Sequence, residues 1–200
     1  MLKRPRMLNE PERSKFNLVF GVLCVILLFA LVVDLWFTNR YFVVEISGGS
    51  MENTLFDGDV VYADRCQNPE RGDIVIIDVT QYREKMGFSG NYIIKRLIAL
   101  EGDTVLCKNQ TLYLKKKGET KYTLLEEPYT DFRTRDFGEI VVGEGEIFFL
   151  GDHRTNSVDS RSEFVGCLKM TDVVGVVPSW ALNAKTTIAS WEHFRSKIGF

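Results

Sequence analysis

The 200-residue sequence predicts a mainly β protein that follows a single N-terminal transmembrane helix. Two observations lead to this fold class. Residues 16–37 form one long apolar run, and residues 40–180 contain many short segments rich in Val, Ile, Tyr and Phe, separated by Gly, Asp, Asn or Pro. The net charge of −2 and the mean hydropathy of −0.06 therefore average over two different parts of the chain.

The N-terminal part has the charge distribution of a membrane anchor. Residues 1–15 carry five Lys or Arg side chains and two Glu side chains, whereas residues 16–33 carry no charge. As a helix, residues 16–37 would span roughly 33 Å, which is enough to cross a bilayer. Because cationic flanks stay in the cytoplasm, residues 1–15 are predicted to be a cytoplasmic tail and residues 38–200 an extracytoplasmic domain.

A cleavable signal peptide is the competing interpretation of this run. It would need a shorter apolar stretch followed by small residues at an A-x-A-like site. Here the run ends in Asp34-Leu-Trp-Phe-Thr-Asn-Arg40, without small residues at the right spacing. An uncleaved signal-anchor is therefore favoured, and Asp34 is expected to reach the lipid headgroups rather than to act inside the membrane.

The outer part is predicted to consist of short strands. These strands are Tyr41–Ile46, Asp59–Ala63, Asp73–Val79, Tyr92–Leu100, Thr104–Cys107, Thr111–Leu114, Ile147–Leu150 and Val173–Val177. Asn109-Gln110 is expected to close a hairpin, and residues 101–146 are expected to form a strand-and-loop excursion. Residues 186–200 carry apolar side chains three or four apart, which predicts a short amphipathic helix packed on the domain or resting on the membrane surface.

Composition and residue spacing exclude several classes of protein. The balance of 25 Lys and Arg against 27 Asp and Glu is not that of a nucleic-acid binder, and 45% hydrophobic residues is too many for a disordered chain. The three cysteines after the anchor are an odd number with wide spacing, which excludes a complete disulfide framework. No CxxC pair or His-rich spacing predicts a metal site, and no cofactor is expected.

Four segments combine residue types that carry chemistry. They are Ser47–Leu55 followed by Phe56–Asp59, Arg71–Ile76, Tyr92–Ile98 followed by Glu101–Asp103, and Gly151–Arg161. Ser50 is the one serine that follows two glycines, which let the backbone turn sharply and direct its N–H groups at a substrate oxygen. Lys95 is a cation within an apolar, strand-like run. Burial would lower the pKa of Lys95 and give a neutral amine that can take a proton from a serine hydroxyl.

The same spacing has two simpler interpretations. Gly48-Gly49-Ser50 could be a glycine-rich turn before a strand, and Lys95 could lie on an edge strand with its amine in solvent. From the residues alone, Ser-Lys catalysis is one alternative beside these two structural interpretations.

The four segments, in this order after a single anchor, resemble the type I signal peptidases of bacteria. The resemblance covers roughly residues 16–180 and implies a largely antiparallel β catalytic domain of the signal peptidase type. It implies that Ser50 is the nucleophile and Lys95 the general base of a Ser-Lys dyad.

The resemblance also assigns roles to residues of the fourth segment. Ser157 would hydrogen-bond to the lysine and orient it. Asp159 and Arg161 would brace the site through an ion pair. The family's activity is expected to need no metal and no cofactor.

The sequence departs from the family pattern at three positions. The Pro that usually follows Ser-Met-x is Asn53 here, which is expected to cost some rigidity, and the Asn of the GDN element is His153. Gly48 stands where many members have a serine whose hydroxyl joins the oxyanion hole. That hole is therefore expected to consist of backbone N–H groups, mainly that of Ser50 together with that of Gly48.

The resemblance further implies a substrate, namely the signal peptide of a secreted preprotein with small residues before the cleavage site. The extended peptide is expected to pair with the edge strand near residues 41–47. The residues expected to line its shallow pockets are Ile46, Met51, Leu55, Ile76 and Ile94. Ser50 lies 13 residues beyond Phe37, at most roughly 45 Å of extended chain, so it is tethered near the outer membrane surface. Membrane lipid and the secretion translocon are the further partners that this location suggests, and no nucleic acid is expected.

The sequence thus predicts a single-pass membrane serine endopeptidase that removes N-terminal signal peptides. A self-cleaving repressor with a Ser-Lys dyad would need a DNA-binding head, which the anchor replaces. Eukaryotic and archaeal signal peptidases have His where this chain has Lys95. The remaining alternative is a non-catalytic, membrane-anchored β domain in surface-protein or pilus assembly, which the departures at Asn53 and His153 keep open.

Overall fold

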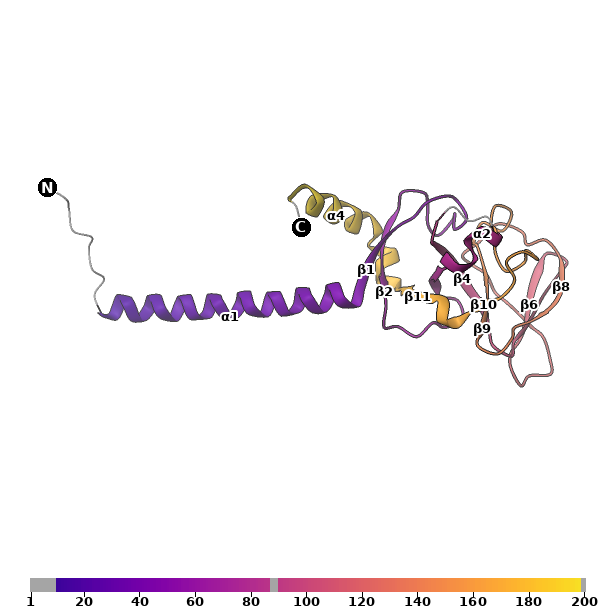
Figure 1. The fold of residues 1–200 in the computed structure, drawn as a ribbon, viewed down its shortest axis with the longest axis horizontal. Helices are drawn as coiled ribbons and strands as arrows, with labels where there is room; N and C mark the ends of the chain where they lie inside the picture. The colour runs from indigo at the N-terminus through magenta and orange to yellow at the C-terminus, as the bar shows by residue number, and fades with distance from the viewer. Residues whose placement is uncertain (1–9, 87–89, 199–200) are drawn as a thin grey trace. The chain divides into compact units, whose positions relative to one another are not determined.

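The structure is a computed structural model that describes residues 10–86 and 90–198. The chain divides into two compact units, Met1–Arg40 and Tyr41–Phe200 (Figure 1). The first contains the helix α1 (Glu10–Arg40), in which Arg13–Arg40 is long and apolar enough to cross a membrane. The apolar side chains of this span are exposed all round the helix, which is the pattern of a helix surrounded by lipid.

The second unit is built mainly from antiparallel strands, which confirms the predicted fold class. A seven-stranded sheet has the order β1-β2-β11-β3-β4-β9-β10. Its strands are β1 (Tyr41–Glu45), β2 (Val60–Asp64), β3 (Ile74–Asp78), β4 (Tyr92–Leu100), β9 (Glu146–Leu150), β10 (Leu168–Lys169) and β11 (Val173–Val177). Within this sheet β1 is an edge strand that pairs with β2, so its other edge has no partner strand among the described residues.

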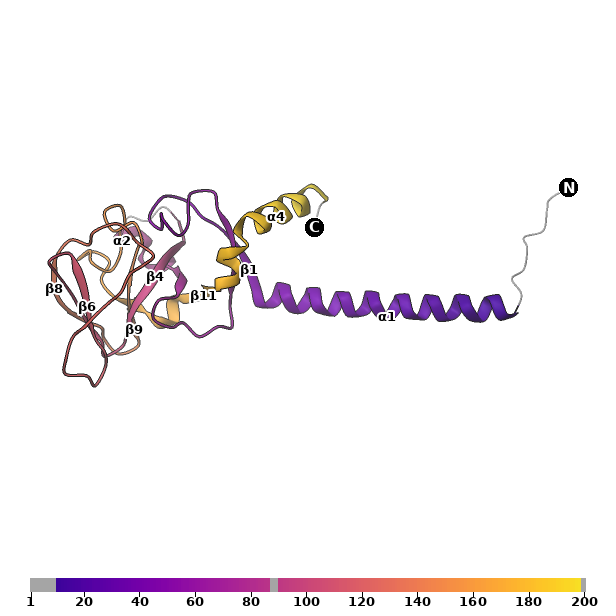
Figure 2. The ribbon, with the colours of Figure 1, turned by 180° about the vertical axis from the view of Figure 1, so that it is seen from behind.

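A smaller four-stranded sheet, in the order β7-β6-β5-β8, forms the rest of the β structure. Its strands are β5 (Thr104–Lys108), β6 (Thr111–Lys115), β7 (Thr123–Leu124) and β8 (Phe137–Val141). All four fall inside the excursion predicted for residues 101–146. Both ribbon views place β6 and β8 at the opposite end of this unit from β1 (Figures 1 and 2).

The predicted hairpin is present, with β5 and β6 paired antiparallel. Asn109 and Gln110 have φ angles of 53° and 63°, the left-handed pair that a two-residue type I′ turn requires. The carboxylate of Asp136, just before β8, accepts the backbone N–H groups of both turn residues, at 2.9 and 2.6 Å. This side chain compensates for the absence of glycine in the turn.

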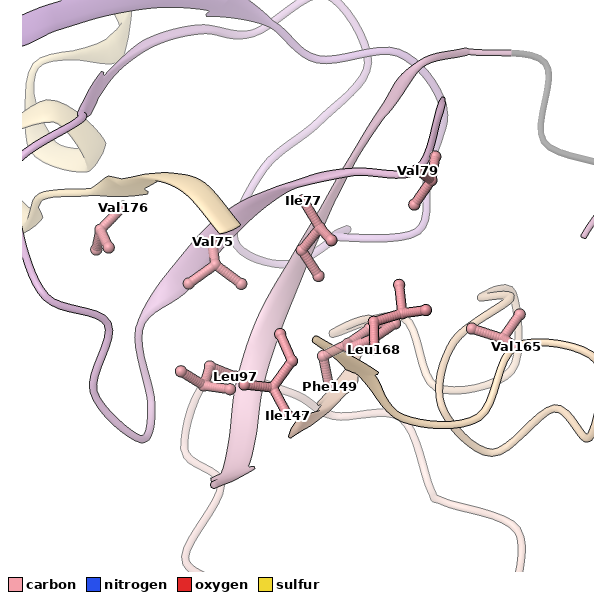
Figure 3. Packing of buried hydrophobic residues seen from close by; sticks show 9 residues of the cluster. All are labelled: Val75, Ile77, Val79, Leu97, Ile147, Phe149, Val165, Leu168 and Val176. Carbon is pink, nitrogen blue, oxygen red and sulfur yellow. The ribbon is translucent and has the colours of Figure 1, made fainter. Parts of the chain in front are cut away.

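Two clusters of buried side chains hold the strands in place. The first packs residues mainly of the large sheet (Figure 3): Val75, Ile77, Val79, Leu97, Ile147, Phe149, Val165, Leu168 and Val176. The second packs residues of both sheets: Ile98, Ala99, Val105, Cys107, Leu112, Leu114, Val142, Phe148 and Leu150. Because successive side chains of a strand point to opposite faces, β4 and β9 contribute to both clusters. The strand that carries Lys95 is therefore fixed by packing on both sides.

Short helices complete the second unit. They are η1 (Thr80–Tyr82), α2 (Arg83–Met86), η2 (Met170–Asp172), α3 (Ser179–Asn183) and α4 (Lys185–Ile198). The helix α4 matches the predicted C-terminal helix and contacts β2. Ile188 is buried, and the hydroxyl of Tyr62 on β2 donates to the carboxylate of Glu192 at 2.5 Å. Packing on the domain, the first of the two predicted placements, is therefore observed for residues 186–198, and residues 199–200 lie outside the described part of the chain.

Candidate active site

Ser50 lies in the turn that follows β1. Gly48 enters this turn with φ of 86°, a left-handed conformation that glycine adopts without strain. The N–H of Leu55 donates to the carbonyl of Met51 at 2.8 Å, and both side chains are 0% exposed. The apolar residues around Ser50 therefore anchor the turn in the core, while Ser50 itself stays partly exposed.

Lys95 extends from the middle of the large sheet toward Ser50. It pairs with Val75 of β3, and only 4% of its surface is exposed. Its Nζ donates to Ser50 Oγ at 2.7 Å and to the carbonyl of Ile94 at 3.0 Å. The structure thus brings together the two residues that the sequence predicted as nucleophile and base.

Burial lowers the pKa of Lys95 from 10.5 to about 8, against the opposite effect of the carboxylates of Asp159 and Asp152. With a pKa of about 8, about one lysine in ten is neutral at pH 7. With an ordinary pKa the neutral fraction would be about one in 3,000. The apolar surroundings of this strand therefore supply most of the lowering of the pKa that a neutral base near pH 7 requires.

A groove of about 970 Å³ runs beside this pair. Residues 42–50, which include most of β1 and the start of the turn, form one wall, and residues 92–95 of β4 contribute to the other. Of the predicted pocket residues, Ile46, Ile76 and Ile94 line the groove. An apolar groove beside a free strand edge can hold an extended peptide.

The prediction that Met51 and Leu55 line the substrate pockets is wrong. Neither residue lines the groove, and both are completely buried. Their side chains occupy the core beneath the turn, where they hold the backbone of Ser50 in place. Sequence alone does not distinguish an apolar residue that faces a substrate from one that anchors a loop.

The predicted hydrogen bond between Ser157 and Lys95 is absent. Ser157 Oγ is buried and has no hydrogen-bond partner among the described residues. It lies against Gly151, where a Cβ would collide with both Ser157 Oγ and the carbonyl oxygen of Ser50. Lys95 instead donates to Ser50 and Ile94. Ser157 faces a second cavity, of about 1,100 Å³, which neither Ser50 nor Lys95 lines.

The ion pair expected between Asp159 and Arg161 is present. Two nitrogens of Arg161 donate to the two carboxylate oxygens of Asp159, each at 2.8 Å. The N–H of Gly151 donates to the same carboxylate at 3.0 Å, and Arg161 also donates to the carbonyl of Arg154 at 2.8 Å. These contacts hold the loop after β9 in one conformation.

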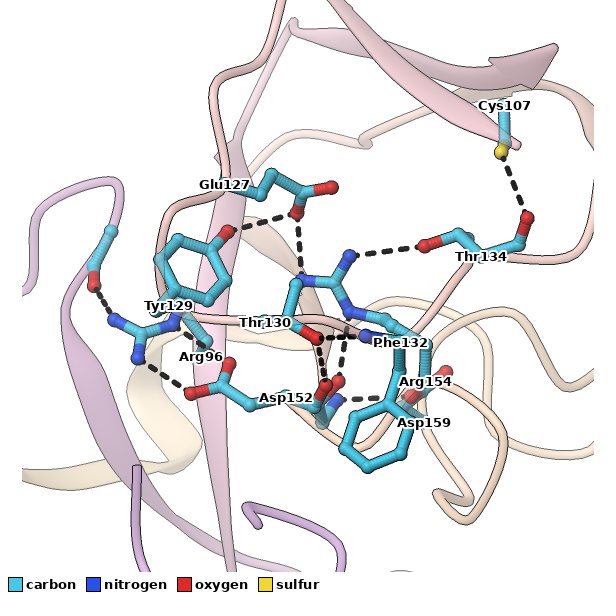
Figure 4. A network of polar contacts seen from close by, with 12 residues as sticks. Arg96, Cys107, Glu127, Tyr129, Thr130, Phe132, Thr134, Asp152, Arg154 and Asp159 are labelled. Carbon is cyan, nitrogen blue, oxygen red and sulfur yellow. Dashed lines mark hydrogen bonds and ion pairs between the residues drawn. The ribbon is translucent and has the colours of Figure 1, made fainter. Parts of the chain in front are cut away.

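A second buried cation, Arg96, has a structural role that the sequence did not reveal. It forms a bidentate pair with Asp152, at 2.8 and 2.6 Å, and its guanidinium lies 3.8 Å from the ring centroid of Tyr129 (Figure 4). It also donates to the carbonyl of Gly72 at 2.7 Å, and the hydroxyl of Thr54 donates to Asp152 at 2.5 Å. Each of the four segments singled out in the sequence thus contributes one member of this network.

Arg154 extends the network to the loop before β8 (Figure 4). It pairs with Glu127 at 2.7 Å and donates to Thr134 Oγ1 at 3.0 Å and to the carbonyl of Gly151 at 2.9 Å. The hydroxyl of Thr130 donates to the carbonyl of Asp152 at 2.6 Å. The loop of residues 125–136 is therefore fixed to the loop that carries His153.

The predicted contribution of Gly48 to an oxyanion hole is wrong. Its N–H donates to the carboxylate of Asp57 at 2.7 Å and is therefore not available to a substrate. The N–H of Ser50 has no hydrogen-bond partner among the described residues. One of the two expected backbone donors thus remains beside the nucleophile.

The departure at Asn53 has a structural reason. Asn53 has φ of 83°, whereas proline is restricted to about −65°, so this turn has a conformation that proline cannot adopt. The Nδ2 of Asn53 donates to Asp131 at 3.0 Å, which ties the turn to the loop before β8. The expectation that Asn53 only loses rigidity is therefore incomplete.

Within the described residues, no group of three or more His, Cys, Asp or Glu side chains could hold a metal ion. The chemistry available at this site is that of a serine hydroxyl, a lysine amine and a free backbone N–H. These are the groups that acyl transfer requires.

Comparisons with known proteins point to one family. The family model described as signal peptidase, peptidase S26, matches residues 16–181. Signal peptidase I P of Bacillus subtilis subsp. natto is 31% identical over 182 residues, which cover 85% of this chain and 92% of the relative. Signal peptidase I of Bacillus licheniformis is 33% identical over 168 residues, covering 78% of this chain and 85% of the relative.

A solved structure is also similar. Signal peptidase I of Enterococcus faecalis V583 is 30% identical, with a TM-score of 0.44, and the match covers 56% of this chain and 98% of that chain. Since the family model spans most of the sequence, this chain belongs to the signal peptidases of peptidase family S26.

Proposed function

We propose that this chain removes N-terminal signal peptides from secreted preproteins, with Ser50 as the nucleophile and Lys95 as the general base. The observation that carries this proposal is the 2.7 Å contact between Lys95 Nζ and Ser50 Oγ. The lysine is buried and its pKa is lowered to about 8, so a neutral amine is accessible near pH 7. A structural lysine at a domain surface would have no such environment.

Substrate binding follows from the free edge of β1. The signal peptide adds as an extended strand along β1, and its backbone groups pair with those of the edge. Ile46, Ile76 and Ile94 form apolar contacts in the groove, which suit small side chains before the scissile bond. The scissile carbonyl then lies between Ser50 Oγ and the unpaired N–H of Ser50.

Acyl transfer proceeds in two halves. Neutral Lys95 takes the proton of the Ser50 hydroxyl as Oγ attacks the scissile carbonyl, and the N–H of Ser50 stabilises the oxyanion. Lys95 gives that proton to the leaving amine, and the mature protein departs. Lys95 then takes a proton from water, which attacks the acyl-enzyme, and Lys95 returns this proton to Ser50 Oγ as the signal peptide is released.

The membrane anchor explains where this reaction takes place. Residues 16–37 span the bilayer, residues 1–15 lie in the cytoplasm, and residues 38–200 form the extracytoplasmic catalytic domain. The cationic N-terminal flank supports this orientation. Preproteins that emerge from the secretion translocon, surrounded by lipid, are the substrates that this location favours.

The test uses the full chain in detergent with a preprotein that bears a signal peptide. The parent chain is expected to cleave it after a small residue, and Ser50→Ala is expected to abolish cleavage without changing the thermal unfolding midpoint. No cleavage by the folded parent chain would contradict the proposal and favour the non-catalytic, membrane-anchored alternative.

A further inference from the structure

We propose that His153 is a positioning residue that aims the backbone N–H of Ser50 at the substrate oxyanion. This inference rests on the proposed function. The turn offers few other donors for the oxyanion, because Gly48 has no side chain and its N–H is already bonded to Asp57. The N–H of Ser50 is then the donor on which stabilisation of the oxyanion depends.

His153 holds the peptide groups on both sides of Ser50. Its Nδ1 lies 3.2 Å from the carbonyl oxygen of Gly49, and its own backbone N–H donates to the carbonyl of Ser50 at 3.1 Å. The Gly49–Ser50 peptide is trans, so its C=O and its N–H point in opposite directions. A hydrogen bond that fixes the Gly49 carbonyl therefore also fixes the direction of the Ser50 N–H.

The imidazole of His153 is itself held by two neighbours. Its Nδ1 lies 2.7 Å from Oε2 of Glu52, and its ring stacks on Phe132 with centroids 3.8 Å apart. Both groups that face Nδ1, the Glu52 carboxylate and the Gly49 carbonyl, are acceptors. Nδ1 must therefore carry a proton, and that single proton is shared between the Glu52 carboxylate and the Gly49 carbonyl.

Gly49 completes this arrangement by having no side chain. A Cβ at Gly49 would come within 2.5 Å of a carboxylate oxygen of Glu52. The carboxylate thus occupies the space beside the Gly49 backbone from which it reaches His153.

His153 acts through the backbone and not on the substrate. Gly49 and Ser50 line the groove, whereas His153 does not. Its effect should therefore appear in the transition state, where the oxyanion forms, and not in the binding of the substrate.

Two substitutions separate the hydrogen bond from the packing of the ring. His153→Phe keeps the stacking on Phe132 and removes the donor. His153→Asn loses the stacking but carries an N–H donor at Nδ2, which is as many bonds from Cβ as Nδ1 of histidine. His153→Phe should lower kcat and keep most of the stability, whereas His153→Asn should keep most of kcat and lower the stability.

The experiment measures kcat and KM on a signal-peptide substrate, and the affinity of a peptide aldehyde that forms a tetrahedral adduct with Ser50. Loss of one oxyanion donor costs about 10²- to 10³-fold in kcat, so a misaligned donor in His153→Phe is expected to cost about 10- to 100-fold. KM should change by less than about twofold, and the aldehyde should bind more weakly by the same factor as kcat. His153→Asn should stay within about threefold of the parent kcat, although its thermal unfolding midpoint should lie below that of His153→Phe.

Thr155→Ala is the matched control, because Thr155 is exposed on the same loop and does not line the groove. It should retain the parent kcat and aldehyde affinity. Parent-like kcat and aldehyde affinity in His153→Phe, or equal losses in both His153 variants, would overturn the proposal while leaving Ser50-dependent cleavage by the parent intact. A parent chain without Ser50-dependent cleavage would overturn the proposed function, and this inference with it.

Discussion

Lys95 and Arg96 are neighbouring cations on one strand, both buried, with different roles. Their exposed fractions are 4% and 8%, and they point to opposite faces of β4. Arg96 meets the carboxylate of Asp152 in a bidentate pair, whereas Lys95 has no ion-pair partner among the described residues. A guanidinium stays charged, and beside a buried carboxylate it organises loops. An amine buried without an ion-pair partner has a lowered pKa, and beside a hydroxyl it can act as a base. The chemistry of each group, together with its partner, decides what burial does to it.

The largest effect should follow from making Lys95 resemble its neighbour. Lys95→Arg keeps a cation beside Ser50, but a guanidinium stays protonated and cannot take the serine proton. We expect cleavage of a preprotein to fall by about 10³-fold or more. A kinetic assay on the full chain measures this, and Lys95→Arg with more than a tenth of the parent activity would contradict the role of Lys95 as base.

Substitution of Arg96 tests whether this buried cation stabilises the fold. Arg96→Met leaves Asp152, which is completely buried, without its partner. Breaking a buried pair from one side typically costs about 3–5 kcal/mol, so the free energy of unfolding should fall by that amount. Denaturant unfolding of the full chain in detergent measures the change, and a loss below about 1 kcal/mol would mean that Arg96 does not hold the loops together.

The same substitution at Lys95, to Met, should raise the free energy of unfolding instead of lowering it. The pKa of Lys95 is about 8 in the folded chain, against 10.5 for a lysine in water, so folding at pH 7 carries an unfavourable contribution of about 3 kcal/mol. Lys95→Met removes this contribution and should stabilise the protein by up to the same amount. Denaturant unfolding at pH 7 measures the difference from the parent.

The pH dependence of this effect follows from the same values. Between about pH 8 and pH 10.5 the unfolded chain binds more protons than the folded chain, so the parent's free energy of unfolding should rise with pH across this window. Lys95→Met should lack that rise. If Lys95→Met were less stable than the parent at pH 7, the lysine would contribute more through its contacts than its burial costs.

A smaller effect is expected at the turn that carries the nucleophile. Asn53→Pro restores the residue of the family pattern but places proline at φ of 83°. The turn would have to change shape, at a cost of about 1–3 kcal/mol in the free energy of unfolding. Thermal unfolding tests this, and an Asn53→Pro variant that is more stable than the parent would show that the turn accepts the proline conformation.

The sequence revealed most of the fold because the strands of the large sheet are apolar runs bounded by turn residues. Eight strands were predicted close to their observed bounds. The strands that were missed are β7, β8 and β10. β7 and β10 have two residues each, and β8 (Phe137–Val141) has exposed residues and no clear alternation. Such strands are defined by their partners more than by their own residues.

The sequence predicted those site residues whose side-chain type itself indicates a chemical role. Ser50 and Lys95 stand out because each residue type is unusual in its surroundings. The roles of Arg96, Ser157 and Met51 could not be read in the same way, because they depend on which face of a strand or loop a side chain occupies. That information appears only when segments that are distant in the sequence pack together.

The pH dependence of kcat/KM tests the central claim most directly, because it reports the pKa of the base in the free enzyme. For the full chain in detergent with a signal-peptide substrate, we expect kcat/KM to fall about tenfold per pH unit well below pH 8 and to level off above it, since burial lowers the pKa of Lys95 to about 8. A rise that continues to pH 10, as for an ordinary lysine, or a flat profile between pH 6 and pH 9, would contradict the account.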